Sequence, residues 1–171
     1  KNADVLAVVY NFVDALSHAK TDTEVVRELA SDDSAYRRLV KTWLEGSPLL
    51  KMLQWASQQG FTVVLTTDHG TVNVHRPSKV VGTKHLTTNL RYKTGIGMSY
   101  QSKHSFVVKD PNAIGLPKQH IADECIFALS DLFYVYPNRY NHFVQYYRNT
   151  YQHGGVSLEE LIIPYAVLTS K

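Results

Sequence analysis

The sequence predicts an α/β fold in which a mostly parallel central sheet is flanked by helices. Two apolar runs rich in β-branched residues, 4–13 and 61–65, have the composition of strands buried on both faces. The chain between them, 21–59, repeats its apolar residues at helical spacing. A strand, then helices, then a second strand is the order typical of parallel α/β domains.

The first predicted strand ends at Asp14, and the sequence Ala15-Leu16-Ser17-His18 follows it. If the chain becomes helical at this point, Asp14 and His18 lie one turn apart on the same helix face. A carboxylate and an imidazole in that arrangement can bind a single ion.

Helices are predicted for 21–30, for 32–44 and from Pro48 to about Gln59. Ser47 and Pro48 have the order of an N-cap followed by proline at the first helical position. The second predicted strand, 61–65, then leads into Asp68-His69-Gly70. In open α/β sheets, ligands bind where strands end in this way.

After Gly70 the pattern changes to short β-like runs separated by glycine and proline, which predicts a hairpin-like β insertion. The predicted elements after Gly70 are β-like runs at 71–75, 87–92 and 105–108, an apolar strand region at 124–136 and an aromatic-rich helix at 138–147. Ser157 and Glu160 have capping-box spacing, which predicts a short helical turn.

The bulk composition limits the class of protein. The chain has 171 residues, of which 44% are hydrophobic, enough for one globular domain with a real core. Cys125 is the only cysteine, so no internal disulfide or thiolate metal cluster is expected, and a reducing, cytoplasmic setting fits. No apolar stretch approaches the roughly 20 residues of a membrane span.

Positive charge is concentrated in one part of the chain. No Asp or Glu occurs from His69 to Lys109, although the net charge of the whole chain is only +3. This basic block contains Arg76, Lys79, Lys84, Arg91, Lys93, Lys103 and Lys109. Such a block indicates an anionic partner, and the alternative is a solvated basic surface.

Three short motifs carry residues suited to metal binding: Asp14-x-x-x-His18, Asp68-His69-Gly70 and His153-Gly154-Gly155. Each motif by itself is typical of a helix cap or a hydrogen-bonded surface group. Together they supply carboxylates and imidazoles, which are good ligands for Zn²⁺. Because these ligands exceed the needs of one tetrahedral ion, the set indicates two metals.

The order and spacing of these motifs resemble the alkaline phosphatase superfamily. The ending 153–164, together with 11–14 and 67–71, is similar to the PglZ branch in particular. The resemblance implies an alkaline-phosphatase-like sandwich in which Asp14, His18 and His153 bind one zinc ion. It also implies that Asp68 and His69 contribute to the second.

The resemblance implies further parts that this sequence does not contain. Superfamily members take another Asp from the first strand and a Ser or Thr nucleophile at a helix N-terminus, both before the Asp-x-x-x-His segment. We therefore expect 1–171 to be the C-terminal part of a larger PglZ-type domain, with no catalytic residue of its own and inactive alone.

The function implied by the resemblance is that of a zinc-dependent phosphoesterase, preferably a phosphodiesterase acting on nucleotide-type diesters. The basic block would contact the substrate phosphate through Lys84, Arg91 and Lys93. Within the PglZ branch, the nearest resemblance is to response regulators in which the domain follows a receiver portion and controls type IX protein secretion. That comparison implies the receiver portion as a partner and leaves room for a homodimer.

Two alternatives remain open from the sequence. The first is a non-catalytic signalling or interaction module that a metal ion stabilises. The second is a sulfatase or phosphomutase relative, which shares the metal ligands and differs in the segment that precedes them.

Overall fold

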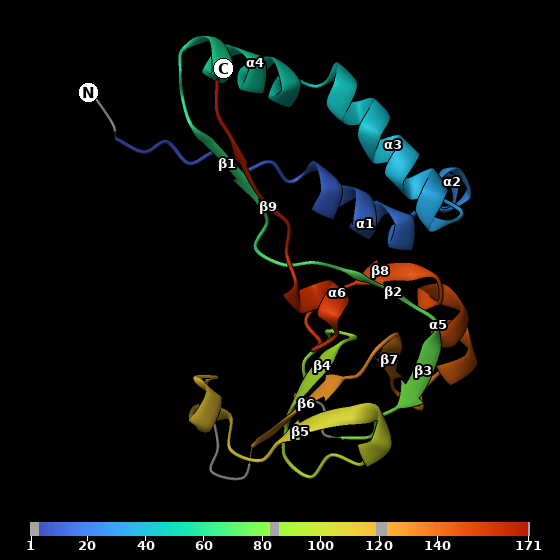
Figure 1. Ribbon diagram of the computed structural model, residues 1–171. Coiled ribbons are helices and arrows are strands. Elements are labelled where there is room, and N and C mark those ends of the chain that lie inside the picture. Colours follow the sequence, from blue (N-terminus) through green and yellow to red (C-terminus); the bar gives the residue numbers. More distant parts are fainter. Residues whose placement is uncertain (1–3, 83–85, 119–122, 171) are drawn as a thin grey trace. The chain divides into compact units, whose positions relative to one another are not determined.

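The computed structural model describes residues 4–82, 86–118 and 123–170, in two compact units that Figure 1 shows as ribbons. The first unit consists of Lys1–Leu65 and Ala166–Lys171, and the second of Thr66–Tyr165. The chain passes between them at Leu65 and again at Tyr165.

The first unit contains most of the helices that the sequence predicts. Its elements are α1 (Phe12–Asp22), α2 (Glu24–Leu29), α3 (Asp33–Gly46), α4 (Pro48–Gln58), β1 (Val63–Thr66) and β9 (Tyr165–Leu168), the last two of which pair. The ring of Phe12 stacks on Trp43 at a centroid distance of 3.7 Å, which packs α1 against α3.

Helix α4 begins as its sequence predicts. Ser47 is the N-cap, its hydroxyl oxygen accepts a hydrogen bond from the Leu50 N–H at 3.4 Å, and Pro48 occupies the first helical position. Proline is tolerated there because its missing N–H would have no partner within the helix. Gly60, with φ +75°, follows the helix end.

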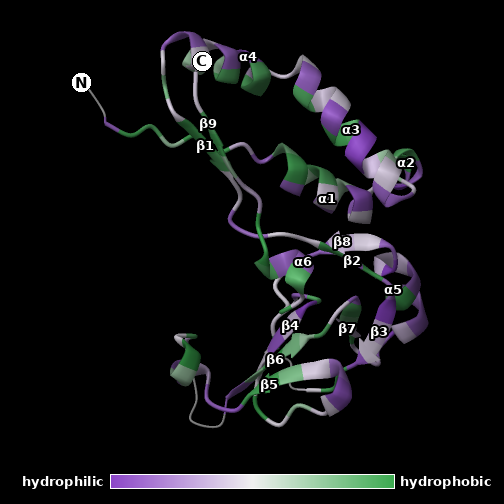
Figure 2. Ribbon diagram, in the orientation of Figure 1, coloured by the Kyte–Doolittle hydropathy of each residue, from purple (hydrophilic) through white to green (hydrophobic). Residues whose placement is uncertain are grey.

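The predicted first strand, 4–13, is not formed. Residues 5–11 have no regular secondary structure, and α1 already begins at Phe12. Val5 and Val9 are each 83% exposed, and Figure 2 shows the hydrophobic colour of this segment. Apolar β-formers make a strand only when a neighbouring strand takes up their backbone hydrogen bonds, and none does so among the described residues.

The second unit is made of small sheets. Its strands are β2 (Val72–Val74), β3 (Arg76–Lys79), β4 (Tyr92–Gly95), β5 (Ser105–Val108), β6 (Glu124–Ala128), β7 (Leu132–Val135) and β8 (Thr150–Gln152). Its helices are η1 (Ser102–His104), η2 (Pro111–Ile114), α5 (Tyr140–Tyr147) and α6 (Leu158–Leu161).

The strand directions do not support the predicted mostly parallel sheet. In the second unit β3 pairs with β7 in parallel, whereas β2–β8, β4–β6 and β5–β6 are antiparallel. The mixed α/β class holds, but neither the parallel sheet nor the sandwich arrangement is confirmed. Apolar runs identify strands without fixing their direction, because the direction depends on partners far away in the sequence.

Strand β7 organises the core of the second unit. Successive side chains of a strand point to opposite faces, so Leu132 and Tyr134 pack in one apolar cluster and Phe133 and Val135 in another. The aromatic residues of α5 pack against the second cluster, at the helical spacing that the sequence shows. Burial raises the pKa of Tyr134 to about 12, and its hydroxyl donates to Ser105 Oγ at 2.7 Å.

Among the described residues, the helices are all too short or too polar to cross a bilayer.

We expect the Ser47→Ala substitution to lower the free energy of unfolding by about 1 kcal/mol, because it removes the N-cap acceptor of α4. Ser57→Ala is the matched control, since Ser57 is exposed near the other end of the same helix. Urea unfolding followed by circular dichroism at 222 nm measures both. Equal effects of the two substitutions would contradict the capping role.

Candidate metal centre

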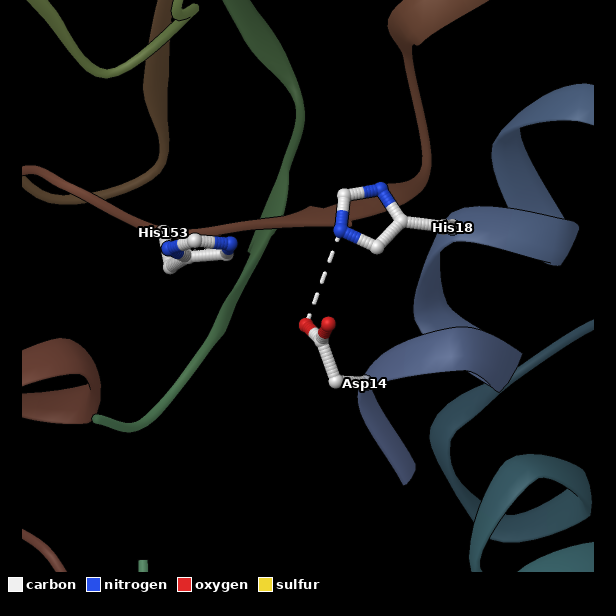
Figure 3. Close-up of side chains that lie close together, drawn as sticks. All are labelled: Asp14, His18 and His153. Atoms are coloured by element: carbon white, nitrogen blue, oxygen red, sulfur yellow. Dashed lines mark ion pairs between the residues drawn. The ribbon is translucent and has the colours of Figure 1, made fainter. Parts of the chain in front are cut away.

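Helix α1 presents Asp14 and His18 on one face, as the four-residue spacing predicts. Asp14 Oδ1 and His18 Nε2 lie 3.6 Å apart, and Figure 3 shows the pair with its connecting dashed line. Two ligands of one tetrahedral zinc ion lie about 3.4 Å apart, given bond lengths of about 2.0–2.2 Å. The side chains are 48% and 64% exposed, so an ion can reach them from solvent.

Asp68 and His69 lie in the loop that follows β1. The His69 Nδ1 lies 3.0 Å from the Gly70 carbonyl oxygen, which can only accept a hydrogen bond. The ring therefore donates from Nδ1, and its Nε2 lies 3.9 Å from Asp68 Oδ1. A hydrogen bond from its own backbone N–H and the proximity of His69 lower the pKa of Asp68, which favours the ionised carboxylate.

The second unit brings His153 against His69. His153 follows β8, and its ring stacks on that of His69 with centroids 3.9 Å apart and planes inclined by 13°. The neutral imidazole is the form that binds metals. Asp68, His69 and His153 therefore form one cluster within this unit, in which His69 lies next to each of the other two.

Two glycines allow the loops of this cluster to lie close to their neighbours. A Cβ atom on Gly70 would lie 1.9 Å from the carbonyl oxygen of Glu159. A Cβ atom on Gly155 would lie 2.6 Å from Arg91 Nη2 and 2.7 Å from Glu160 Oε2. Both loops thus need glycine for close approach.

The predicted phosphate-binding role of Arg91 and Lys93 is corrected by their burial, because both are 0% exposed. Arg91 forms an ion pair with Glu160 at 2.7 Å. Lys93 Nζ donates to the Thr87 carbonyl oxygen at 2.7 Å and lies 4.4 Å from the centre of the Tyr136 ring. Desolvation lowers the pKa of Lys93 to about 8. Lys84, the third predicted phosphate ligand, lies outside the described residues.

Other charges of the basic block are neutralised by acids from later in the chain. Arg76 pairs with Asp131 at 2.5 Å, and Lys109 pairs with Glu124 at 2.8 Å. These carboxylates follow the block in sequence and meet it only through folding. The block is therefore less positive in the folded chain than its sequence indicates.

Two polar residues next to the cluster were not singled out as site residues from the sequence. Asn89 Nδ2 donates to the His153 carbonyl oxygen at 3.3 Å. Glu160 is 4% exposed, and its carboxylate accepts from Arg91. The capping-box spacing from Ser157 predicts one of its contacts, the bond from the Ser157 N–H at 3.0 Å. Its pairing with Arg91 spans 69 positions and has no local signal.

Carboxylates and imidazoles at loop ends, within a mixed α/β chain, define a candidate hydrolase of the alkaline phosphatase class. The comparison with protein families agrees: the model of the BREX system PglZ alkaline phosphatase-like domain matches residues 1–169. The chain therefore belongs to the PglZ family, which suggests phosphoesterase-type activity. No curated protein matches the chain in sequence.

We expect Gly70→Ala to lower the free energy of unfolding by about 3 kcal/mol, because the new methyl group would overlap the backbone of Glu159 and neither backbone can yield cheaply. Gly46→Ala is the control, since a Cβ atom there meets nothing within 4 Å. Thermal and urea unfolding measure both variants. A Gly70→Ala chain as stable as the Gly46→Ala chain would contradict the packing argument.

Proposed function

We propose that the chain is part of a zinc-dependent phosphoesterase that hydrolyses nucleotide-type phosphodiesters. The observation that carries this proposal is the stacked His69–His153 pair beside Asp68. Two imidazoles beside a carboxylate supply donor types that bind zinc.

The proposed assignment divides the ligands between two ions. Asp14, His18 and His153, a set of residue types able to hold a metal ion, would bind the first. Asp68 and His69 would contribute to the second. The ring contact between His69 and His153 brings one proposed ligand of each ion together within the second unit.

The residues fit zinc in donor type. The Gly70 carbonyl oxygen, at 3.0 Å, fixes the Nδ1–H tautomer of His69 and leaves Nε2 to bind the ion. Asp14 and Asp68 supply negative charge that offsets the charge of the ions. When bound, Zn²⁺ supplies Lewis acidity toward phosphoryl oxygens and lowers the pKa of the attacking hydroxyl group.

The finer role in the cell rests on resemblance alone. The ending 153–164 resembles that of PorX, a response regulator linked to type IX secretion. By that resemblance the chain would be the effector part of such a regulator, with a receiver portion and a phosphodiester or nucleotide substrate as its partners. The Ser or Thr nucleophile would come from a part of the complete domain outside these residues.

We expect the purified chain to bind Zn²⁺ and to lose affinity on substitution of the ligands. Asp14→Asn and His153→Gln should each reduce the zinc retained after dialysis, measured by plasma mass spectrometry, because each removes a ligand. Diffraction at the zinc edge should place anomalous density at these side chains. His142→Gln, an exposed histidine on α5, is the control. Retention of zinc by the ligand variants at the level of the control would contradict the assignment.

We expect the complete domain to hydrolyse a chromogenic phosphodiester such as bis(p-nitrophenyl) phosphate. EDTA should abolish the release of p-nitrophenol and added Zn²⁺ should restore it, because the ions activate the nucleophile and stabilise the leaving oxygen. A domain that binds zinc and gains thermal stability, but releases no product from mono- or diesters, would instead be the metal-stabilised module.

A further inference from the structure

We infer that Arg91 and Glu160 are positioning residues whose buried ion pair holds the loops 68–70 and 153–155 in fixed positions for metal binding. The inference rests on the proposed function, because it concerns the placement of the ligands assigned there. All of its contacts lie within the second unit.

The Glu160 carboxylate accepts hydrogen bonds from Arg91 and from two backbone N–H groups that follow His153 in the chain. Its Oε1 accepts from Arg91 Nε and from the Gly155 N–H, both at 2.8 Å. Its Oε2 accepts from Arg91 Nη2 at 2.7 Å and from the Ser157 N–H at 3.0 Å. A carboxylate has about four lone-pair sites, so these donors leave it no spare capacity.

The backbone of the same residue reaches the other ligand loop. The Glu160 carbonyl oxygen accepts from the Gly70 N–H at 2.9 Å, one position beyond His69. One residue therefore contacts both loops: its side chain binds Gly155 and its main chain binds Gly70. A shift of Glu160 moves both loops, and with them His69 and His153.

Arg91 anchors this arrangement to the β-structure of the unit. Its guanidinium donates to the carbonyl oxygens of Ala128 at 3.1 Å, Ser130 at 2.8 Å and Leu132, which end β6, form the following turn and begin β7. The fork geometry of arginine matches the carboxylate in a bidentate manner, which lysine cannot reproduce. The site is thus tied to the most buried strand of the unit.

Asn89 adds a third contact to the same scaffold. Its Oδ1 accepts from the Arg91 N–H at 2.6 Å, and its Nδ2 donates to the His153 carbonyl oxygen at 3.3 Å. The segment that presents Arg91 therefore also holds the backbone of a ligand. Because zinc ligands must reach their places within about 0.2 Å, small loop displacements weaken binding.

The test compares the Zn²⁺ affinity of the chain with that of Glu160→Gln and Arg91→Lys, by competition with a chromogenic chelator. Both variants must keep the circular dichroism spectrum of the wild type at the assay temperature. We expect zinc binding to weaken by about 10–100-fold, the usual cost of removing a group that orients metal ligands. Asp131→Asn is the control, because it breaks another Arg–carboxylate pair of this unit without contacting either loop.

Amide hydrogen exchange of the apo-protein separates local positioning from general destabilisation. We expect the Gly70, Gly155 and Ser157 amides to exchange faster in Glu160→Gln, while those of the β3–β7 pair keep their wild-type rates. Uniformly faster exchange would mean that the ion pair serves stability alone and would overturn the inference.

If Glu160→Gln does not fold, Asn89→Ala provides the decisive variant, because it frees the His153 carbonyl oxygen and keeps both charges. Weaker zinc binding by this variant supports positioning, and wild-type binding overturns it. A wild-type chain that binds zinc, with folded Glu160→Gln and Arg91→Lys variants of equal affinity, overturns the inference and leaves the proposed function standing. A wild-type chain that binds no zinc overturns both.

Discussion

The second unit depends on the ion pair between Arg91 and Glu160, which are 0% and 2% exposed at their side chains. Burial alone raises the pKa of a carboxyl group, yet the hydrogen bonds and charge of Arg91, with the N–H groups of Ser157 and Gly155, outweigh it and leave the pKa of Glu160 lowered. The carboxylate thus stays charged in the interior. A buried pair of this kind gains little net stability over an apolar pair. The main effect of the pair is on geometry, because each buried charged group needs hydrogen-bond partners in particular positions.

This geometric constraint explains why short, glycine-containing loops can hold the proposed metal ligands. A loop without regular structure has many conformations of similar energy, and ordering it costs entropy. Here the Gly70 N–H and the Gly155 N–H both donate hydrogen bonds to Glu160, so one residue limits the conformational freedom of two loops. The glycines in turn permit the approach, because a side chain at either position would overlap the acceptor or its neighbours. The close approach of the two loops and their hydrogen bonds to Glu160 therefore require each other.

The sequence predicted local features better than long-range ones. The N-cap at Ser47, the shared face of Asp14 and His18 and the aromatic face of α5 all follow from neighbours within one or two turns. The strand predicted at 4–13 is not formed, because apolar residues alone do not provide the neighbouring strand that its backbone hydrogen bonds require. The mostly parallel sheet is not confirmed for a related reason, since the direction of a strand is defined only relative to its partner.

The basic block shows the same limit in electrostatic terms. Counting charges along 69–109 predicts a positive surface for an anion, and Arg91 and Lys93 looked like its most useful members. Folding brings Glu160 to Arg91, Asp131 to Arg76 and Glu124 to Lys109, each from outside the counted window. A run of one sign is evidence for a partner of the opposite sign, but that partner can be the rest of the same chain. For Arg91 the internal partner also defines the role, because the charge that seemed suited to a substrate instead aligns the loops that carry His69 and His153.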